Sequence, residues 1–160
     1  MTAIVLLLSG PNLNLLGERE PEVYGTATLD DHVAAARAVA ETHDLELEHL
    51  QSNHEGALVD AVHGARGRCA AIVINAGALT HYGRSLQDAL AAFDGPVIEL
   101  HLSNPAAREE WRHTSVIAPV ATAAIAIGYP WPPGSIGSAA RSTKRGALRC
   151  SSPTSRTSAT

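Results

Sequence analysis

The sequence predicts an α/β protein with a five-stranded parallel sheet and helices on both faces of that sheet. Short apolar runs alternate along the chain with segments of helical periodicity, which is the pattern of β-α units. The middle runs, such as 71–74, are continuously apolar, as expected of strands that are covered on both faces. Each element is predicted from its own local pattern.

A long polar loop separates the first predicted strand from the first predicted helix. The apolar run 4–8 predicts the strand, and the loop extends from Ser9 to Gly25. Thr28 and Asp31 have the spacing of a capping box, so a helix is predicted to begin there and to continue to about residue 43.

Two further strand–helix units follow. Residues 45–50 alternate apolar and polar side chains and predict the second strand, and the run 70–75 predicts the third. After each strand, apolar residues recur with the spacing of a buried helix face: Leu58, Ala61, Val62 and Ala65, then Leu86, Ala89, Leu90 and Phe93.

The last predicted strands are a fourth at 96–102 and a fifth at 120–127. Between them, Asn104-Pro105 combines an N-cap with a proline at the first helical position, which predicts a short helix through Arg112. This alternation predicts flavodoxin-like strand order for one domain at 1–128. Beyond it, prolines and then Ser, Thr, Gly and Arg replace the apolar periodicity, so residues 129–160 are predicted to form a disordered tail.

Charge and cysteine content narrow the class of protein. The first 133 residues contain seven Arg against 16 acidic residues, so this part has no basic patch for nucleic acid. The two cysteines form no disulfide framework, and reduced thiols suit the cytoplasm. The N-terminal apolar run is too short for a signal peptide or a membrane span. We therefore expect a cytoplasmic protein that binds neither nucleic acid nor membranes.

Polar residues stand at the ends of three predicted strands, and these ends indicate one site. Asn12 follows the first strand, Asn75 closes the third, and His101 and Ser103 close the fourth. In an open parallel sheet, ligands bind outside the carboxyl ends of the strands. This is the strongest indication in the sequence that the chain is an enzyme.

The sequence lacks the common cofactor and metal signatures. Neither GxGxxG nor GxxxxGK[ST] is present, and His54-Glu55 lacks the second histidine of HExxH. No Cys/His cluster has the spacing of metal ligands. We expect neither a cofactor nor a metal, which leaves proton-transfer chemistry.

Two pairs of residues could transfer protons. Arg19 and Tyr24 share the long loop, and a guanidinium near a tyrosine favours the tyrosinate that a general base requires; the alternative is a loop anchor beside a solvated charge. Glu99 and His101 are two apart on a strand and face the same way, so Glu99 could orient His101 as a general acid. Here the alternative is a structural His–carboxylate pair.

A third group is the pair Arg108 and Arg112, which are four residues apart on the predicted short helix. With Glu109 and Glu110 beside them, they could form surface ion pairs or clamp an anion or a hydroxyl. The sequence leaves both interpretations open.

Five blocks of the sequence resemble type II 3-dehydroquinate dehydratases, in the correct order over roughly residues 3–125. The resemblance lies in GPNLNLLG at 10–17 with REP at 19–21 and YG at 24–25, QSNHEG at 51–56, NAG at 75–77 with TH at 80–81, ELHLSN at 99–104, and RE at 108–109 with WR at 111–112. Five blocks together are far more specific than any single motif.

The resemblance implies a flavodoxin-like enzyme that reversibly dehydrates 3-dehydroquinate to 3-dehydroshikimate without metal or cofactor, by anti elimination through an enolate. It implies that Tyr24 is the base, that Arg19 holds it as tyrosinate, and that Asn12 stabilises the enolate through a water. His101 would be the acid that protonates the departing hydroxyl, and Glu99 would orient it.

The resemblance also implies a substrate site and an assembly. Binding of the substrate carboxylate is expected from Asn75, Leu102 and Ser103, and binding of the ring hydroxyls from His81, Arg112 and Asp88. Family members assemble as dodecamers of trimers, in which the Asp88 position reaches a neighbouring subunit's site. The chain departs from the family pattern at Tyr82-Gly83, at Thr114 and in the C-terminal stretch, where the family has a glycine turn and an apolar helix.

Two other classes of function are alternatives to the enzyme. One is a non-catalytic relative that binds a small polar ligand or acts as an assembly partner, but a binder has no need for both Tyr24 and Arg19. The other is a flavodoxin-like binding or receiver domain, which the missing flavin loop and the missing acidic pair after the first strand disfavour.

Overall fold

The computed structural model describes residues 2–19 and 24–128 of the 160-residue chain. Five strands form one parallel sheet in the order β2-β1-β3-β4-β5, which confirms the predicted flavodoxin-like order. The strands are β1 (Ala3–Ser9), β2 (Leu45–Gln51), β3 (Cys69–Asn75), β4 (Val97–His101) and β5 (Ala123–Ala126). The predicted tail, 129–160, lies outside the described residues.

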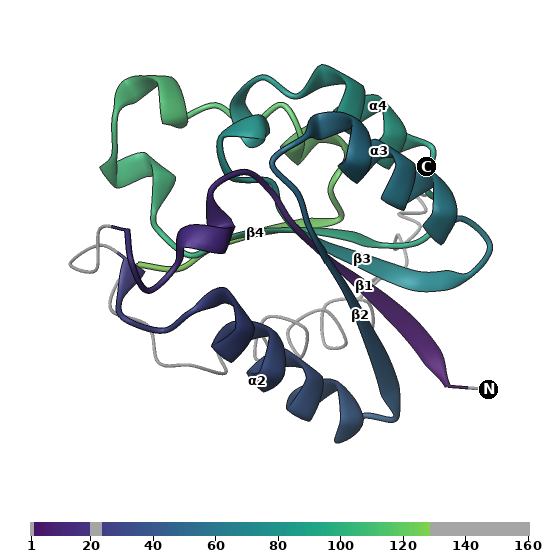
Figure 1. Ribbon diagram of the computed structural model, residues 1–160. Helices are drawn as coiled ribbons and strands as arrows, with labels where there is room; N and C mark the ends of the chain where they lie inside the picture. The colour runs from purple at the N-terminus through teal and green to yellow at the C-terminus, as the bar shows by residue number, and fades with distance from the viewer. Residues whose placement is uncertain (1, 20–23, 129–160) are drawn as a thin grey trace, which may run out of the picture.

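Helices cover both faces of the sheet, as predicted. Figure 1 shows α2 (Leu29–Glu41) on one face and α3 (Glu55–Ala65) with α4 (Arg84–Ala91) on the other. Successive strand residues point to opposite faces, so each face has its own apolar core. Toward α3 and α4 lie Leu6, Leu8, Ile72 and Ile74, and toward α2 lie Leu7, Val73, Ile98 and Leu100. Within the described residues, no helix has the length and apolar character needed to cross a membrane.

The capping box predicted at the start of α2 is present. The Thr28 hydroxyl accepts a hydrogen bond from the backbone N–H of Asp31 at 3.2 Å, and the Asp31 carboxylate accepts one from the backbone N–H of Thr28 at 2.9 Å. These bonds satisfy two backbone donors that the helix cannot satisfy itself. The helix ends at Glu41, two residues before the predicted end.

The predicted helix through Arg112 is wrong. Two short 3₁₀ turns, Pro105–Ala107 and Glu110–Arg112, take its place. The N-cap was predicted correctly, because the Asn104 side chain accepts a hydrogen bond from the N–H of Ala106 at 3.1 Å. Arg108 is extended, with φ −111° and ψ −163°, so no helix continues through it and the i, i+4 face expected for Arg108 and Arg112 does not form.

The fifth strand is shorter than predicted. Residues Ala118–Val120, which include Pro119, form a 3₁₀ turn, and strand pairing begins only at Ala123. Proline supplies no ladder donor, so it favours this turn over an earlier strand start. The turn packs beside α4. Just before it, the Ser115 hydroxyl hydrogen-bonds to Glu99 of β4.

His32 of α2 is buried and has no hydrogen-bond partner among the described residues, and we expect it to make stability depend on pH. Its side chain is 5% exposed, and neither ring nitrogen has a partner among the described residues. Burial lowers the pKa of His32 from its ordinary value of 6.5, and the nearby Asp31 carboxylate opposes this only in part. The folded protein therefore binds the extra proton less readily than the unfolded chain does.

The sign of the effect follows from linkage. Above about pH 6.5 both states carry neutral His32, and below it the unfolded chain gains a proton that the folded state resists, so stability falls as pH falls. Urea unfolding at pH 8 and pH 5.5 should show a smaller loss of stability in His32→Leu than in the wild type. His63→Leu, at an exposed position of α3, is the matched control. Equal losses in all three proteins would contradict the prediction.

Candidate active site

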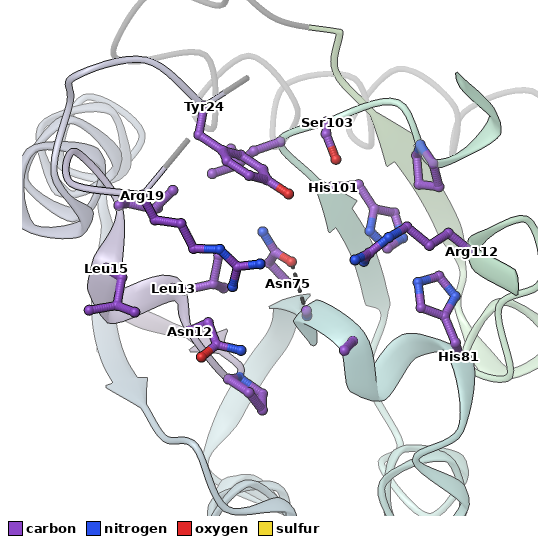
Figure 2. A pocket seen from close by; sticks show the side chains of 16 residues that line it. Asn12, Leu13, Leu15, Arg19, Tyr24, Asn75, His81, His101, Ser103 and Arg112 are labelled. Carbon is purple, nitrogen blue, oxygen red and sulfur yellow. Dashed lines mark hydrogen bonds between the residues drawn. The ribbon is translucent and has the colours of Figure 1, made fainter. Parts of the chain in front are cut away.

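A cavity opens at the carboxyl ends of β1, β3 and β4, the edge where the sequence predicted a site. Figure 2 shows side chains from the loop after β1, from the ends of β3 and β4, and from the segment 105–112 pointing into it. Nine predicted site residues line the cavity: Asn12, Arg19, Tyr24, Asn75, His81, His101, Leu102, Ser103 and Arg112. Leu13, Leu15 and Leu16 add an apolar wall that the sequence analysis did not assign.

Glycine allows the ends of β1 and β3 to lie together. A Cβ atom at Gly10 would be 2.3 Å from the carbonyl oxygen of Ala76, so no other residue fits there without movement of the backbone. Asn12 has a left-handed backbone, with φ 67°, and its N–H donates to Oδ1 of Asn53 at 2.9 Å. Asn53 therefore helps to hold Asn12 at the cavity.

Asn75 has a fixed amide orientation. Its side chain is 8% exposed, and Oδ1 accepts a hydrogen bond from the N–H of Gly77 at 3.2 Å (Figure 2). With Oδ1 engaged by Gly77, Nδ2 is the group that can donate to a ligand. This donor suits the carboxylate that was predicted to bind here.

Glu99 and His101 form the pair that their spacing on β4 predicts. His101 Nε2 and Glu99 Oε1 are 3.0 Å apart. Glu99 is fully buried and does not line the cavity, while His101 does. Burial alone would raise the pKa of the Glu99 carboxyl, but hydrogen bonds from His101, Ser115 and Thr80 outweigh it, so this pKa lies below its ordinary value. Glu99 is therefore a carboxylate at neutral pH.

Tyr24 is hydrogen-bonded by an arginine that the sequence analysis did not assign to it. Nη1 of Arg108 donates to the Tyr24 hydroxyl, and its Cζ lies 5.6 Å from the centre of the tyrosine ring. Arg19, the predicted partner, lines the same cavity. The bond from Arg108 holds the Tyr24 hydroxyl at the cavity. The sequence had singled out Arg108 with Arg112 for surface ion pairs or a clamp on an anion or hydroxyl, but nothing in its pattern linked Arg108 to Tyr24.

Arg112 and His81 stand together on the opposite side of the cavity from Tyr24 (Figure 2). Arg112 donates from Nε to Glu109 at 2.8 Å, and its Cζ lies 4.1 Å from the centre of the Trp111 ring. Arg112 thus makes a surface ion pair and also lines the cavity, so the two interpretations of this residue left open by the sequence are compatible.

His81 is held through its Nδ1. This nitrogen lies 2.7 Å from the carbonyl oxygen of Thr114, and the ring meets Trp111 edge-on at 5.1 Å. Because a carbonyl only accepts, Nδ1 carries a proton and Nε2 serves a ligand. The contact uses the backbone of Thr114, so it does not depend on the side chain at this unusual position. Tyr82, the other residue at which the chain departs from the family pattern, is 61% exposed.

Asp88 is the one predicted substrate residue that the structure places away from the cavity. It lies on the exposed side of α4 and does not line the cavity of its own chain. Its predicted contact with a neighbouring subunit's site stays a prediction. Within residues 2–19 and 24–128, no group of three or more His, Cys, Asp and Glu side chains is placed to hold a metal ion.

Comparisons with known proteins identify related sequences over most of the chain. A family model described as Dehydroquinase class II matches residues 3–130. The chain is 59% identical over 126 residues to 3-dehydroquinate dehydratase 1 of Corynebacterium efficiens, covering 79% of this chain and 83% of that protein. It is 58% identical over 117 residues to the 3-dehydroquinate dehydratase of Bacillus licheniformis, covering 73% and 81%.

The chain is also similar to solved structures of type II dehydroquinases. The type II dehydroquinase of Propionibacterium acnes has a TM-score of 0.80 and 37% identity, covering 92% of this chain and 98% of that one. The type II dehydroquinase of Butyrivibrio crossotus has a TM-score of 0.76 and 41% identity, covering 78% and 88%.

Proposed function

Since the chain belongs to the class II dehydroquinase family, we propose that its cavity is the site at which it reversibly dehydrates 3-dehydroquinate to 3-dehydroshikimate in the shikimate pathway. The enzyme is a lyase, and the reaction removes a proton and a hydroxyl from neighbouring carbons. The residues that carry each step are assigned below from their positions in the cavity.

Proton removal is assigned to Tyr24. Its phenolate takes the proton from the carbon next to the ketone, and the electrons of the broken C–H bond form an enolate. Arg108, hydrogen-bonded to the hydroxyl, and Arg19, in the same cavity, supply the positive charge that favours the phenolate. Asn12, held by Asn53 at the cavity wall, is assigned to the enolate oxygen through a water.

Loss of the hydroxyl is assigned to His101. The imidazolium gives its proton to the departing hydroxyl, the C–O bond breaks, and the enolate electrons form the new C=C bond as water leaves. Glu99 stabilises the imidazolium through Nε2, which leaves Nδ1 as the nitrogen that can serve the substrate. Afterwards Tyr24 returns its proton to solvent and His101 takes one up.

The remaining cavity residues are assigned to substrate binding. Asn75 Nδ2, the Ser103 hydroxyl and the backbone of 102–103 are assigned to the carboxylate, since all three residues line the cavity. His81 and Arg112, on the other side, suit the ring hydroxyls as acceptor and donor. From the family resemblance we propose a trimer-based dodecamer in the cytoplasm, in which Asp88 reaches the cavity of a neighbouring subunit; Asp88 does not line the cavity of its own chain.

One observation carries this function. The cavity places a tyrosine hydroxyl bonded by an arginine and a histidine bonded by a buried carboxylate in front of the same space. An elimination needs one group that takes a proton and another that gives one, and these two side chains are assigned to the two roles. A non-catalytic binder would gain nothing from this arrangement.

The assay is the absorbance of the conjugated enone product when 3-dehydroquinate is added. We expect turnover without added nicotinamide or flavin, and the same rate after exhaustive chelation, because proton transfer by these side chains needs no metal. No product formation would remove the proposed function. Activity that is lost with chelator and restored by one metal would contradict the metal-free assignment.

A further inference from the structure

Two hydroxyls, that of the buried Thr80 and that of the half-buried Ser115, converge on the Glu99 carboxylate, which hydrogen-bonds to His101. The Ser115 hydroxyl donates to Glu99 Oε1 at 2.7 Å and the Thr80 hydroxyl donates to the same oxygen at 3.1 Å. The backbone ties these residues together, because the N–H of Val116 donates to the carbonyl of Thr80 at 2.8 Å. With His101, three donors meet at Oε1, while Oε2 is buried with no partner among the described residues.

Ser115 can only donate to Glu99. A serine oxygen has one proton and two acceptor positions. Ser115 Oγ accepts from the N–H of Ile117 at 3.1 Å and from that of Ala118 at 2.9 Å, which uses both acceptor positions. Its single proton must therefore point to Glu99, so Oε1 accepts this hydrogen bond.

This arrangement favours the proton of the Glu99–His101 pair on His101. Hydrogen bonds donated by the Ser115 and Thr80 hydroxyls stabilise Oε1 as an unprotonated carboxylate oxygen, and a proton on Oε2 would find no acceptor among the described residues. Glu99 is therefore an anion at 0% exposure, and a buried anion requires a nearby cation or donor. His101 is the only one of its three partners that can become a cation.

We propose that Thr80 and Ser115 are positioning residues for the catalytic acid, which act through Glu99 to keep the proton on His101. The inference rests on the proposed function, because His101 needs this proton only if it protonates a leaving group. Neither hydroxyl touches the cavity, so neither is a catalytic residue.

The test uses Thr80→Val and Ser115→Ala, with Thr80→Ser and Ser115→Thr as matched controls that keep each hydroxyl. We expect each loss of a hydroxyl to lower kcat about tenfold, the effect of one hydrogen bond to a charged group, with KM unchanged and with the controls close to the wild type. Ser115→Ala also removes the acceptor of two N–H groups. Should it fail to fold, Thr80→Val decides, because the one bond assigned to the Thr80 hydroxyl is that to Glu99.

Two readouts separate positioning from a structural role. Exchange of the proton next to the ketone should persist in Thr80→Val while dehydration falls, because exchange needs Tyr24 and not His101. In a His101→Ala background, Thr80→Val should cost almost nothing further, since its effect passes through His101.

The inference is overturned if both hydroxyl variants keep the full kcat, if exchange falls in parallel with dehydration, or if Thr80→Val costs as much without His101 as with it. A wild type that forms no product is a different outcome, because it removes the proposed function and the inference together. An active wild type with unaffected variants removes the inference alone.

Discussion

The Tyr24→Phe variant is expected to lose nearly all turnover while it still binds substrate. The substitution keeps the ring and removes only the oxygen that Arg108 contacts. Positioned proton transfer contributes about 10²–10⁴ to the rate, so kcat should fall by that factor. Calorimetric titration with 3-dehydroquinate should give a Kd close to that of the wild type, because the groups assigned to binding are unchanged.

Tyr82→Phe is the matched control, since it removes the same atom from a side chain that is 61% exposed and does not line the cavity. Its kcat should equal that of the wild type. If Tyr24→Phe retains more than about a tenth of wild-type turnover, proton transfer at this position is worth too little for a general base, and the assignment of Tyr24 fails.

The second large effect is expected at His101. His101→Ala should lower the rate of dehydration by about 10²–10⁴, because the hydroxyl must then leave without a proton donor. Exchange of the proton next to the ketone should be less affected, since Tyr24 removes that proton first and leaves an enolate that can be reprotonated. The absorbance of the enone product measures dehydration, and deuterium incorporation followed by NMR measures proton exchange.

His63→Ala, which removes an exposed imidazole from α3, controls for the loss of a histidine as such. An equal loss of exchange and dehydration in His101→Ala would argue for a concerted path or for a structural role of His101. The distinction matters for Thr80 and Ser115 too, because their test relies on the same separation of steps.

Much of the fold can be predicted from the sequence because its signals are local. The apolar runs, the i, i+4 spacing of Leu58 and Val62, and the capping box of Thr28 and Asp31 each involve neighbours along the chain. The two elements that were wrong, the helix through Arg112 and the early start of the fifth strand, lie in the loop-rich segment 104–122. There, weak local preferences compete with contacts to the rest of the molecule.

Much of the cavity was also predictable. Polar residues at the ends of parallel strands meet at one edge of the sheet, so the sequence alone places Asn75 and His101 together. The pairing of His101 with Glu99 follows from the alternation of a strand, in which residues two apart share a face. The assignment of Tyr24 and Arg19 to one reaction required the resemblance of whole blocks, because one tyrosine in a loop has no specific pattern.

The hydrogen-bond partners of Tyr24 and Glu99 are visible only in the tertiary structure. Arg108 and Tyr24 are 84 residues apart, and Ser115 and Glu99 are separated by the two 3₁₀ turns that replace the predicted helix. Periodicity carries no information about such contacts, because they depend on the paths of loops and on which strands are neighbours. The chain therefore encodes its sheet, its helices and the residue types at the strand ends in local patterns. Packing settles which arginine hydrogen-bonds to the Tyr24 hydroxyl and which hydroxyls hydrogen-bond to the Glu99 carboxylate, since a hydrogen bond forms only where the fold brings donor and acceptor within about 3 Å.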